Sequence, residues 1–208
     1  MNTQNISEIQ TNTIIKEDHD GWINLPAWNG FQARNRTYSS IDSEESSDGI
    51  IKAHIVGVIT NQKYLLSQAQ FNAIKYLNEN SELVRDSLLN SLLDDYSNTK
   101  DIYEELMPEI NVIEDYKNYV GVSFLHIMDS EKNGFAYYGF ELGCSWDEEH
   151  GAGAMMYKDR VIKTGLAEES FNHWNCYEDN GTLEYQQEKW QRDNKINTYR
   201  KKWWEFWK

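Results

Sequence analysis

Two alternating apolar runs on either side of an Asn-Gly pair constrain the fold of this chain most strongly. In the first run, residues 119–128, the alternate positions are Val120, Val122, Phe124, His126 and Met128. In the second run, residues 135–143, they are Ala136, Tyr138, Phe140 and Leu142. Alternate side chains of a strand share a face, and Asn-Gly favours the tight turn between antiparallel strands. The pattern therefore predicts a β-hairpin with one buried face.

Two helices are predicted upstream of this hairpin. The first begins after Ser67, which has capping-box spacing to Gln70. Its apolar stripe consists of Phe71, Ile74 and Leu77. The second is expected to be capped by Ser81 and to continue through Tyr96, with one side lined by Leu83, Val84, Leu88, Leu92 and Leu93.

The order of the elements predicts the fold class. Residues 21–25, 31–38 and 50–59 have strand patterns before the helices, and residues 154–157 with 160–164 predict a further hairpin after them. A short helix is expected at 166–174, and the chain from residue 182 is expected to be helical. Strands before a helix pair and hairpins after it predict an α+β fold, with the helix pair packed on a mostly antiparallel sheet.

The chain length of 208 residues suits one domain with an appended arm. We predict a polar flexible leader at residues 1–20, a single α+β domain at 21–179, and a basic, aromatic helical arm at 180–208. No apolar run has membrane-spanning length, and the leader lacks the apolar stretch of a signal peptide. We therefore expect a cytoplasmic protein of bacterial type.

The charge of the chain is strongly negative and unevenly distributed. The formal net charge is -14, and residues 1–179 hold 13 Lys and Arg against 30 Asp and Glu. Residues 180–208 hold seven Lys and Arg against four Asp and Glu. An acidic body repels nucleic acid phosphates and anionic lipids and attracts basic proteins. The charge therefore predicts a basic protein partner and argues against nucleic acid and membrane ligands.

The run Trp146-Asp147-Glu148-Glu149-His150-Gly151 is the most distinctive local feature, and it must form a loop because so many charges cannot be buried together. One interpretation is a metal or proton-transfer site made by Asp147, Glu149 and His150, with His126 as a further ligand. The other is architectural: Asp147 or Glu149 accepts hydrogen bonds from the backbone of the turn, Trp146 packs on the sheet, and His150 orients a neighbour.

Weaker patterns surround this loop. A Cys144/His150 dyad and the metal-ligand spacing of His173 and Cys176 are both conceivable chemical sites, although a small buried hydrophobe is the simpler interpretation of Cys144. Arg160 is expected to form an ion pair with a carboxylate of the loop. The arm's tryptophans are expected to pack on the domain or on a second copy of the chain, and they are Trp190, Trp203, Trp204 and Trp207.

The loop run, together with Gly153 and the following Asp159-Arg160-Val161, resembles the signature of an uncharacterised bacterial family of domains of unknown function. The resemblance covers roughly residues 21–171. Related small acidic proteins occur among the immunity proteins of polymorphic toxin systems, so the resemblance implies an interaction role. It supplies no catalytic residues.

These observations favour a non-enzymatic cytoplasmic binding module, immunity-like, that neutralises a basic toxin or enzyme without a cofactor. The expected acidic face consists of Asp42, Glu44, Glu45, Asp48, Asp147, Glu148 and Glu149, and Trp146 and His150 are expected to bind beside it. The alternative is a metal-dependent hydrolase that uses residues 147–150 and His126. A homodimer through the Trp-rich arm is a further expectation.

Overall fold

The computed structural model describes residues 13–15, 20–33, 45–57, 59–60, 63–64 and 66–205. The strands are β1 (Thr13–Ile15), β2 (Asp20–Asn24), β3 (Ile50–Ile55), β4 (Ile59–Thr60), β5 (Lys63–Tyr64), β6 (Val120–Lys132), β7 (Phe135–Cys144), β8 (Ala152–Tyr157) and β9 (Arg160–Gly165). The α-helices are α1 (Gln68–Glu79), α2 (Ser81–Asp94), α3 (Tyr96–Tyr103), α4 (His173–Asn180) and α5 (Leu183–Glu205). Short 3-10 helices are η2 (Pro26–Trp28), η3 (Glu104–Leu106), η4 (Ile113–Asn118) and η5 (Ala167–Ser170).

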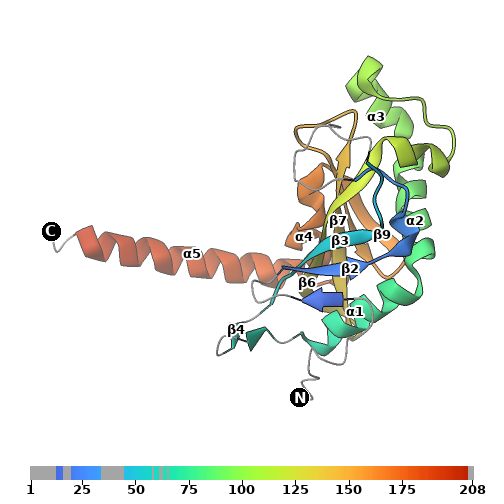
Figure 1. The fold of residues 1–208 in the computed structure, drawn as a ribbon. Coiled ribbons are helices and arrows are strands. Elements are labelled where there is room, and N and C mark those ends of the chain that lie inside the picture. Colours follow the sequence, from blue (N-terminus) through green and yellow to red (C-terminus); the bar gives the residue numbers. More distant parts are fainter. Residues whose placement is uncertain are drawn as a thin grey trace.

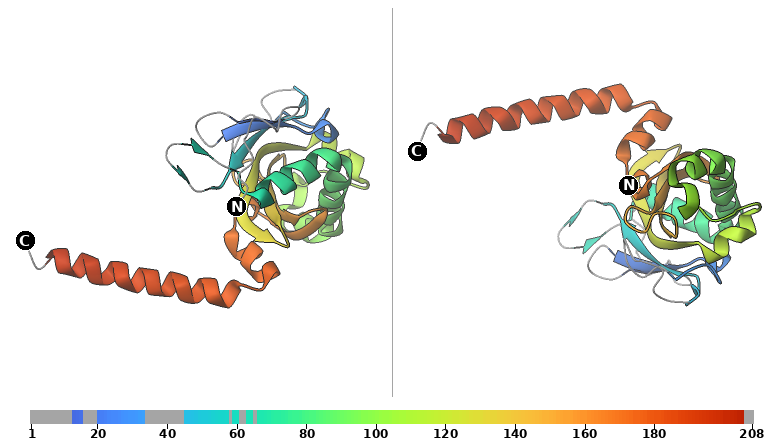
Figure 2. Two further views of the ribbon diagram at one scale, coloured as in Figure 1. Left: turned by 90° about the horizontal axis from the view of Figure 1, so that it is seen from below. Right: turned by 90° about the horizontal axis from the view of Figure 1, so that it is seen from above.

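The predicted α+β class is confirmed. The described chain forms a seven-stranded sheet in the order β1-β2-β3-β6-β7-β8-β9, and β4 pairs with β5 separately. All neighbours in the large sheet are antiparallel except β3 and β6. Helices α1 and α2 cover one face of the sheet, and η5 and α4 pack on the other face. Helix α5 projects away from the sheet (Figures 1 and 2).

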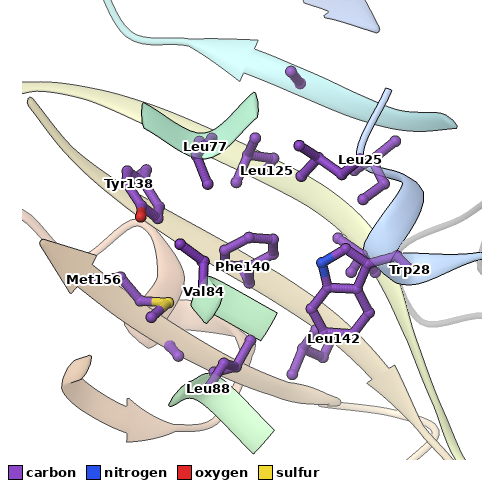
Figure 3. Packing of buried hydrophobic residues seen from close by; sticks show 14 of the residues in the cluster. Leu25, Trp28, Leu77, Val84, Leu88, Leu125, Tyr138, Phe140, Leu142 and Met156 are labelled. Atoms are coloured by element: carbon purple, nitrogen blue, oxygen red, sulfur yellow. The ribbon is translucent and has the colours of Figure 1, made fainter. Parts of the chain in front are cut away.

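The central hairpin of β6 and β7 is confirmed, but the predicted buried face of β6 is wrong for part of the strand. Asn133 and Gly134 adopt φ of 51° and 77°, which the tight turn requires. The predicted β7 face is buried in the main core, whereas β6 carries register shifts between Val122 and Phe124 and between Ile127 and Glu131. A bulge inverts the side-chain alternation beyond it. Leu125 therefore lies on the core face (Figure 3), and Phe124 and His126 lie on the opposite face.

The first helix begins as predicted. The backbone N–H of Gln70 donates to Ser67 Oγ at 3.2 Å, and the N–H of Ser67 donates to Gln70 Oε1 at 3.0 Å. The Gln70 amide also donates to the carbonyls of Val56 and Met128, so the capping residue ties α1 to β6. On α1, Ile74 and Leu77 are buried, while Phe71 is half-buried.

The second helix differs from its prediction at both its cap and its stripe. Asn80 occupies the cap position in place of Ser81, and α2 ends at Asp94. Leu83 is exposed, because Val84, Leu88 and Leu89 form the buried stripe. Val84 and Leu88 pack against side chains of the central strands (Figure 3).

Several predicted strands and helices differ from the structure in their bounds or fall outside the described residues. The predicted strand at 31–38 falls largely outside the described residues, and the strand predicted at 50–59 ends at Ile55. The helix predicted at 166–174 is replaced by η5 and α4. The C-terminal helix is confirmed as α5. Among the described residues, none of the helices has the length and apolar character needed to span a membrane.

Helix α4 is attached to the sheet by a charge cluster around Asp179, so the expected pairing of Arg160 with the acidic loop is wrong. Arg160 donates two hydrogen bonds to Asp179, at 2.8 and 2.9 Å. Tyr137 and Lys132 donate to the same carboxylate at 2.7 and 3.0 Å. The hydrogen bonds from Arg160 lower the pKa of Asp179 well below its usual range, and those from Tyr137 and Lys132 add to this.

We expect Asp179→Asn to lower the free energy of unfolding by about 2 kcal/mol at neutral pH, because it removes charge-assisted hydrogen bonds. A carboxyl whose folded pKa is depressed stabilises the protein above its unfolded pKa, near 4, and loses that contribution as the pH falls through the folded value. The difference between wild type and variant should therefore shrink below about pH 4 in urea titrations. Asp193→Asn, on exposed α5, is the control and should be neutral. An equal difference at all pH values would contradict this role.

Candidate functional site

The register of the sheet gathers several loops at one end. Val120 at the start of β6 pairs with Cys144 at the end of β7, and Leu142 pairs with Ala152 at the start of β8. Because β3 runs parallel to β6, the start of β3 lies at the same end. Gln32 N–H donates to Val120 O at 3.2 Å, which brings residues 25–33 there as well.

Helix α3 and the segment after it join the same end of the sheet. The Tyr103 hydroxyl donates to Asp147 Oδ2 at 2.6 Å, and the Tyr96 hydroxyl donates to Pro108 O at 2.9 Å. Figure 1 shows α3 at the end of the molecule away from α1. We call residues 45–48, 94–118 and 145–150 together the acidic end.

The loop between β7 and β8 is organised around Asp147. Its Oδ1 accepts a hydrogen bond from the His150 N–H at 2.8 Å and lies 3.2 Å from His150 Nδ1. The Gly151 N–H donates to Asp147 O at 2.9 Å, and Gly151 has φ of 65°, a conformation that glycine adopts readily. Trp146 is buried beside Tyr116. The backbone hydrogen bonds that the architectural interpretation proposed for Asp147 are therefore present, and the ring contact of Trp146 is with η4.

The ionisation of Asp147 follows from these contacts. Partial burial alone would raise the pKa of Asp147, but hydrogen bonds from Tyr103 and from the backbone and imidazole of His150 outweigh it and lower the pKa. Burial, together with the same carboxylate, raises the pKa of Tyr103 far above its usual value. Asp147 is thus an ionised residue that holds the loop and α3 together, while Glu148, Glu149 and His150 are exposed around it.

His126 lies far from the loop. It is six residues along β6 from Val120, which is about 20 Å of strand. Its Nε2 lies 2.9 Å from Glu141 Oε2 on β7. Within the described part of the chain, no group of three or more His, Cys, Asp and Glu side chains is arranged to hold a metal ion.

Glu141 was missed by the sequence reasoning. It is only 5% exposed, and its Oε1 has no hydrogen-bond partner among the described residues. Phe124 and Phe171 flank the His126 ring, at centroid distances of 6.1 and 5.2 Å. A glutamate on the outer face of a strand gives no sequence signal of burial. The pair is a buried polar contact across the hairpin, beneath the end of η5.

Both cysteine thiols are buried. Cys144 is buried, and its Sγ lies 3.6 Å from Asp147 O, whereas the His150 imidazole is directed to the Asp147 carboxylate. His173 Nδ1 lies 3.5 Å from Asp129 Oδ1. Cys176 is buried, and burial raises the pKa of its thiol to about 12.

The acidic end displays little positive charge. Its three segments contain thirteen Asp and Glu residues and two lysines, Lys100 and Lys117. Lys100 forms an ion pair with Glu109, and Lys117 lies over the Phe31 ring. The exposed carboxylates include Glu45, Asp48, Asp101, Glu104, Glu105, Glu148 and Glu149. Asp42 and Glu44 lie outside the described residues.

Three aliphatic side chains stand exposed among these carboxylates. Ile102 is 73% exposed, Leu106 is 70% exposed and Val112 is 50% exposed. They come from α3, η3 and the segment before η4. The sequence reasoning did not select them, because residues 97–118 show no regular period.

The C-terminal arm does not pack back on the domain at Trp190, which is 60% exposed. For Trp190 alone, this corrects the expectation of packing on the domain. The side chains of Trp203, Trp204 and Trp207 lie outside those that the structure describes.

Comparison with known proteins identifies the family. No curated protein and no solved structure matches the chain with significant similarity. The family model described as "Domain of unknown function (DUF6985)" matches residues 19–171, which span β2 to the end of η5 and include the whole acidic end. The chain therefore belongs to the DUF6985 family.

Proposed function

We propose that this protein is a non-enzymatic, immunity-like binding module that neutralises a basic toxin or enzyme in the bacterial cytoplasm through its acidic end. The observation that carries the proposal is the exposure of Ile102, Leu106 and Val112 among carboxylates that have few basic neighbours. A contiguous apolar patch rimmed by polar groups marks a protein interaction site, and we infer that these three side chains form one. Complementary charge speeds the encounter and selects the partner.

The local geometry supports a preformed surface. Asp147 connects α3 to the loop after β7, so Glu148 and Glu149 are displayed from a fixed turn. Glu104 adopts φ of 48° and ψ of -119°, a sparsely populated backbone conformation that costs a non-glycine residue about 1–3 kcal/mol. Strained residues of this kind concentrate at functional surfaces. A preformed surface loses little conformational entropy on binding.

A growth-rescue assay tests the proposal. The chain is co-expressed with the product of the adjacent gene, which the proposal expects to be toxin-like, and wild type is expected to restore growth. Glu148→Lys with Glu149→Lys should abolish rescue and weaken the affinity at least about tenfold at low salt. The matched control is Glu131→Lys with Glu178→Lys, which makes the same charge change at exposed positions outside the acidic end.

The apolar contribution has its own test. Leu106→Ser should weaken binding to that partner at both low and high salt, because the hydrophobic contact is not screened by ions. Leu83→Ser is the control, since Leu83 is also exposed but lies near the start of α2. The proposal is wrong if the adjacent gene encodes no toxin-like protein and no basic partner binds. It is also wrong if the Glu148 and Glu149 variant binds the partner as tightly as the control variant at Glu131 and Glu178.

A further inference from the structure

Helix α5 is a long helix whose contacts with the domain are mainly with α4. Every residue from 187 to 195 is exposed, and Tyr185 and Trp190 are each 60% exposed. Its 23 residues span about 34 Å, and the helix extends away from the sheet (Figures 1 and 2). The distal part of a continuous α5 therefore cannot reach its own domain.

A solitary helix of this composition has little to stabilise it. Helices in proteins owe most of their stability to the packing of one face. The ion pair between Arg192 and Glu188 is exposed, at 3.8 Å, and such a pair contributes only a few tenths of a kcal/mol. The exposed Trp190 ring adds a large apolar surface that gains free energy on burial. These features indicate that α5 packs on another molecule.

The net positive charge of α5 complements the negative charge of the acidic end. Residues 183–205 carry six Lys and Arg against four Asp and Glu, whereas the acidic end carries thirteen carboxylates and two lysines. The acidic end also presents Ile102, Leu106 and Val112, on which aromatic side chains can pack. The same chain thus contains both a basic, aromatic helix and an acidic, partly apolar surface.

We propose that α5 of one molecule docks on the acidic end of a second copy of this chain. The inference rests on the surface assigned under the proposed function, and it makes the second copy a competitor of the basic partner. The contact is heterologous, because it joins two different surfaces. Two molecules can close it by exchanging arms, and an open series of such contacts would form larger assemblies.

Sedimentation velocity across a concentration series tests this assembly on the full chain. Wild type should self-associate at low ionic strength and dissociate at high ionic strength. Lys189→Glu with Lys195→Glu should weaken self-association at least about tenfold. Lys75→Glu with Lys163→Glu is the matched control, because both lysines are exposed in the domain and the charge change is the same. A wild type that stays monomeric at every concentration overturns the inference.

Charge exchange identifies the two surfaces. Glu148→Lys with Glu149→Lys should also weaken self-association, and all four substitutions in one chain should restore it, because each reversed surface again meets its complement. Zero-length cross-linking of mixed isotope-labelled and unlabelled protein should join Lys189 or Lys195 to carboxylates of the acidic end between copies. Cross-links between two arms, or no recovery in the fourfold variant, would overturn the inference.

The arm variant separates this inference from the proposed function. Lys189→Glu with Lys195→Glu leaves the acidic end unaltered, so it should still rescue growth. Loss of self-association with intact rescue supports both proposals. If the Glu148 and Glu149 variant loses rescue but still self-associates, the inference about the arm is wrong and the proposed partner-binding function is supported.

Discussion

Gly139→Ala is expected to lower the free energy of unfolding by about 3 kcal/mol, at the upper end of ordinary overpacking effects. A Cβ on Gly139 would lie 1.7 Å from Ser170 O and 2.4 Å from Ser170 C. These are backbone atoms of η5, so the clash cannot be relieved by a rotamer change. The Ser170 hydroxyl donates to Ala167 O at 2.6 Å, which fixes η5 internally. The alanine must therefore push η5 away from β7.

Urea titration and thermal melting measure this effect, and a graded series defines its cause. Gly153→Ala should also destabilise, because its Cβ would lie 2.7 Å from Ala167 O. Gly57→Ala is the control: Gly57 is exposed, has no atom within 4 Å of an added Cβ, and should change stability by less than about 0.5 kcal/mol. Equal stability of the Gly139 and Gly57 variants would show that η5 does not pack directly on β7.

His126→Ala is expected to lower the free energy of unfolding by about 3 kcal/mol, because it leaves the buried carboxyl group of Glu141 without its hydrogen-bond partner. Glu141 is 5% exposed, and its second oxygen already has no hydrogen-bond partner among the described residues. Removal of the imidazole also takes away the ring that packs between Phe124 and Phe171. Equilibrium unfolding at neutral pH measures the loss.

A double substitution separates the lost pair from simple lost packing. His126→Leu with Glu141→Leu removes both polar groups and keeps apolar volume, so it should recover most of the stability. Glu141→Leu alone should be tolerated better than His126→Ala. A double variant as unstable as the sum of its single variants would mean that the pair is not coupled. In that case the buried contact contributes only through volume.

Local signals predicted much of this fold. The Ser67 capping box, the Asn-Gly turn and the buried face of β7 each depend on residues close together in the chain, and all three are confirmed. The predicted face of β6 is wrong beyond Val122, because a bulge shifts the alternation and depends on pairing with β7. Likewise, whether Leu83 or Leu89 is buried depends on how α2 lies on the sheet.

Only those contacts of the candidate site that join residues close together in the chain could be predicted from the sequence. Asp147 was selected, and its contact with His150 three residues away follows from turn geometry. Tyr103, which also contacts Asp147, lies 44 positions away in the chain, and no periodic pattern in the sequence predicts that contact. The same holds for Glu141, whose burial depends on η5, and for the exposed Leu106. Charge composition predicted an acidic surface, but the position of that surface depends on the sheet register.

The single parallel pair in the sheet has a consequence for folding kinetics. Strands β6 to β9 are joined by consecutive short connections and can form locally, whereas Ala53 and Leu125 meet only after the chain closes around the three intervening α-helices. Closing a long loop costs conformational entropy before the strand contacts can contribute a compensating free energy. We expect β2 and β3 to join last, so that a newly synthesised chain brings Glu45 and Asp48 to the same end of the sheet as Glu148 only in the final stage of its maturation.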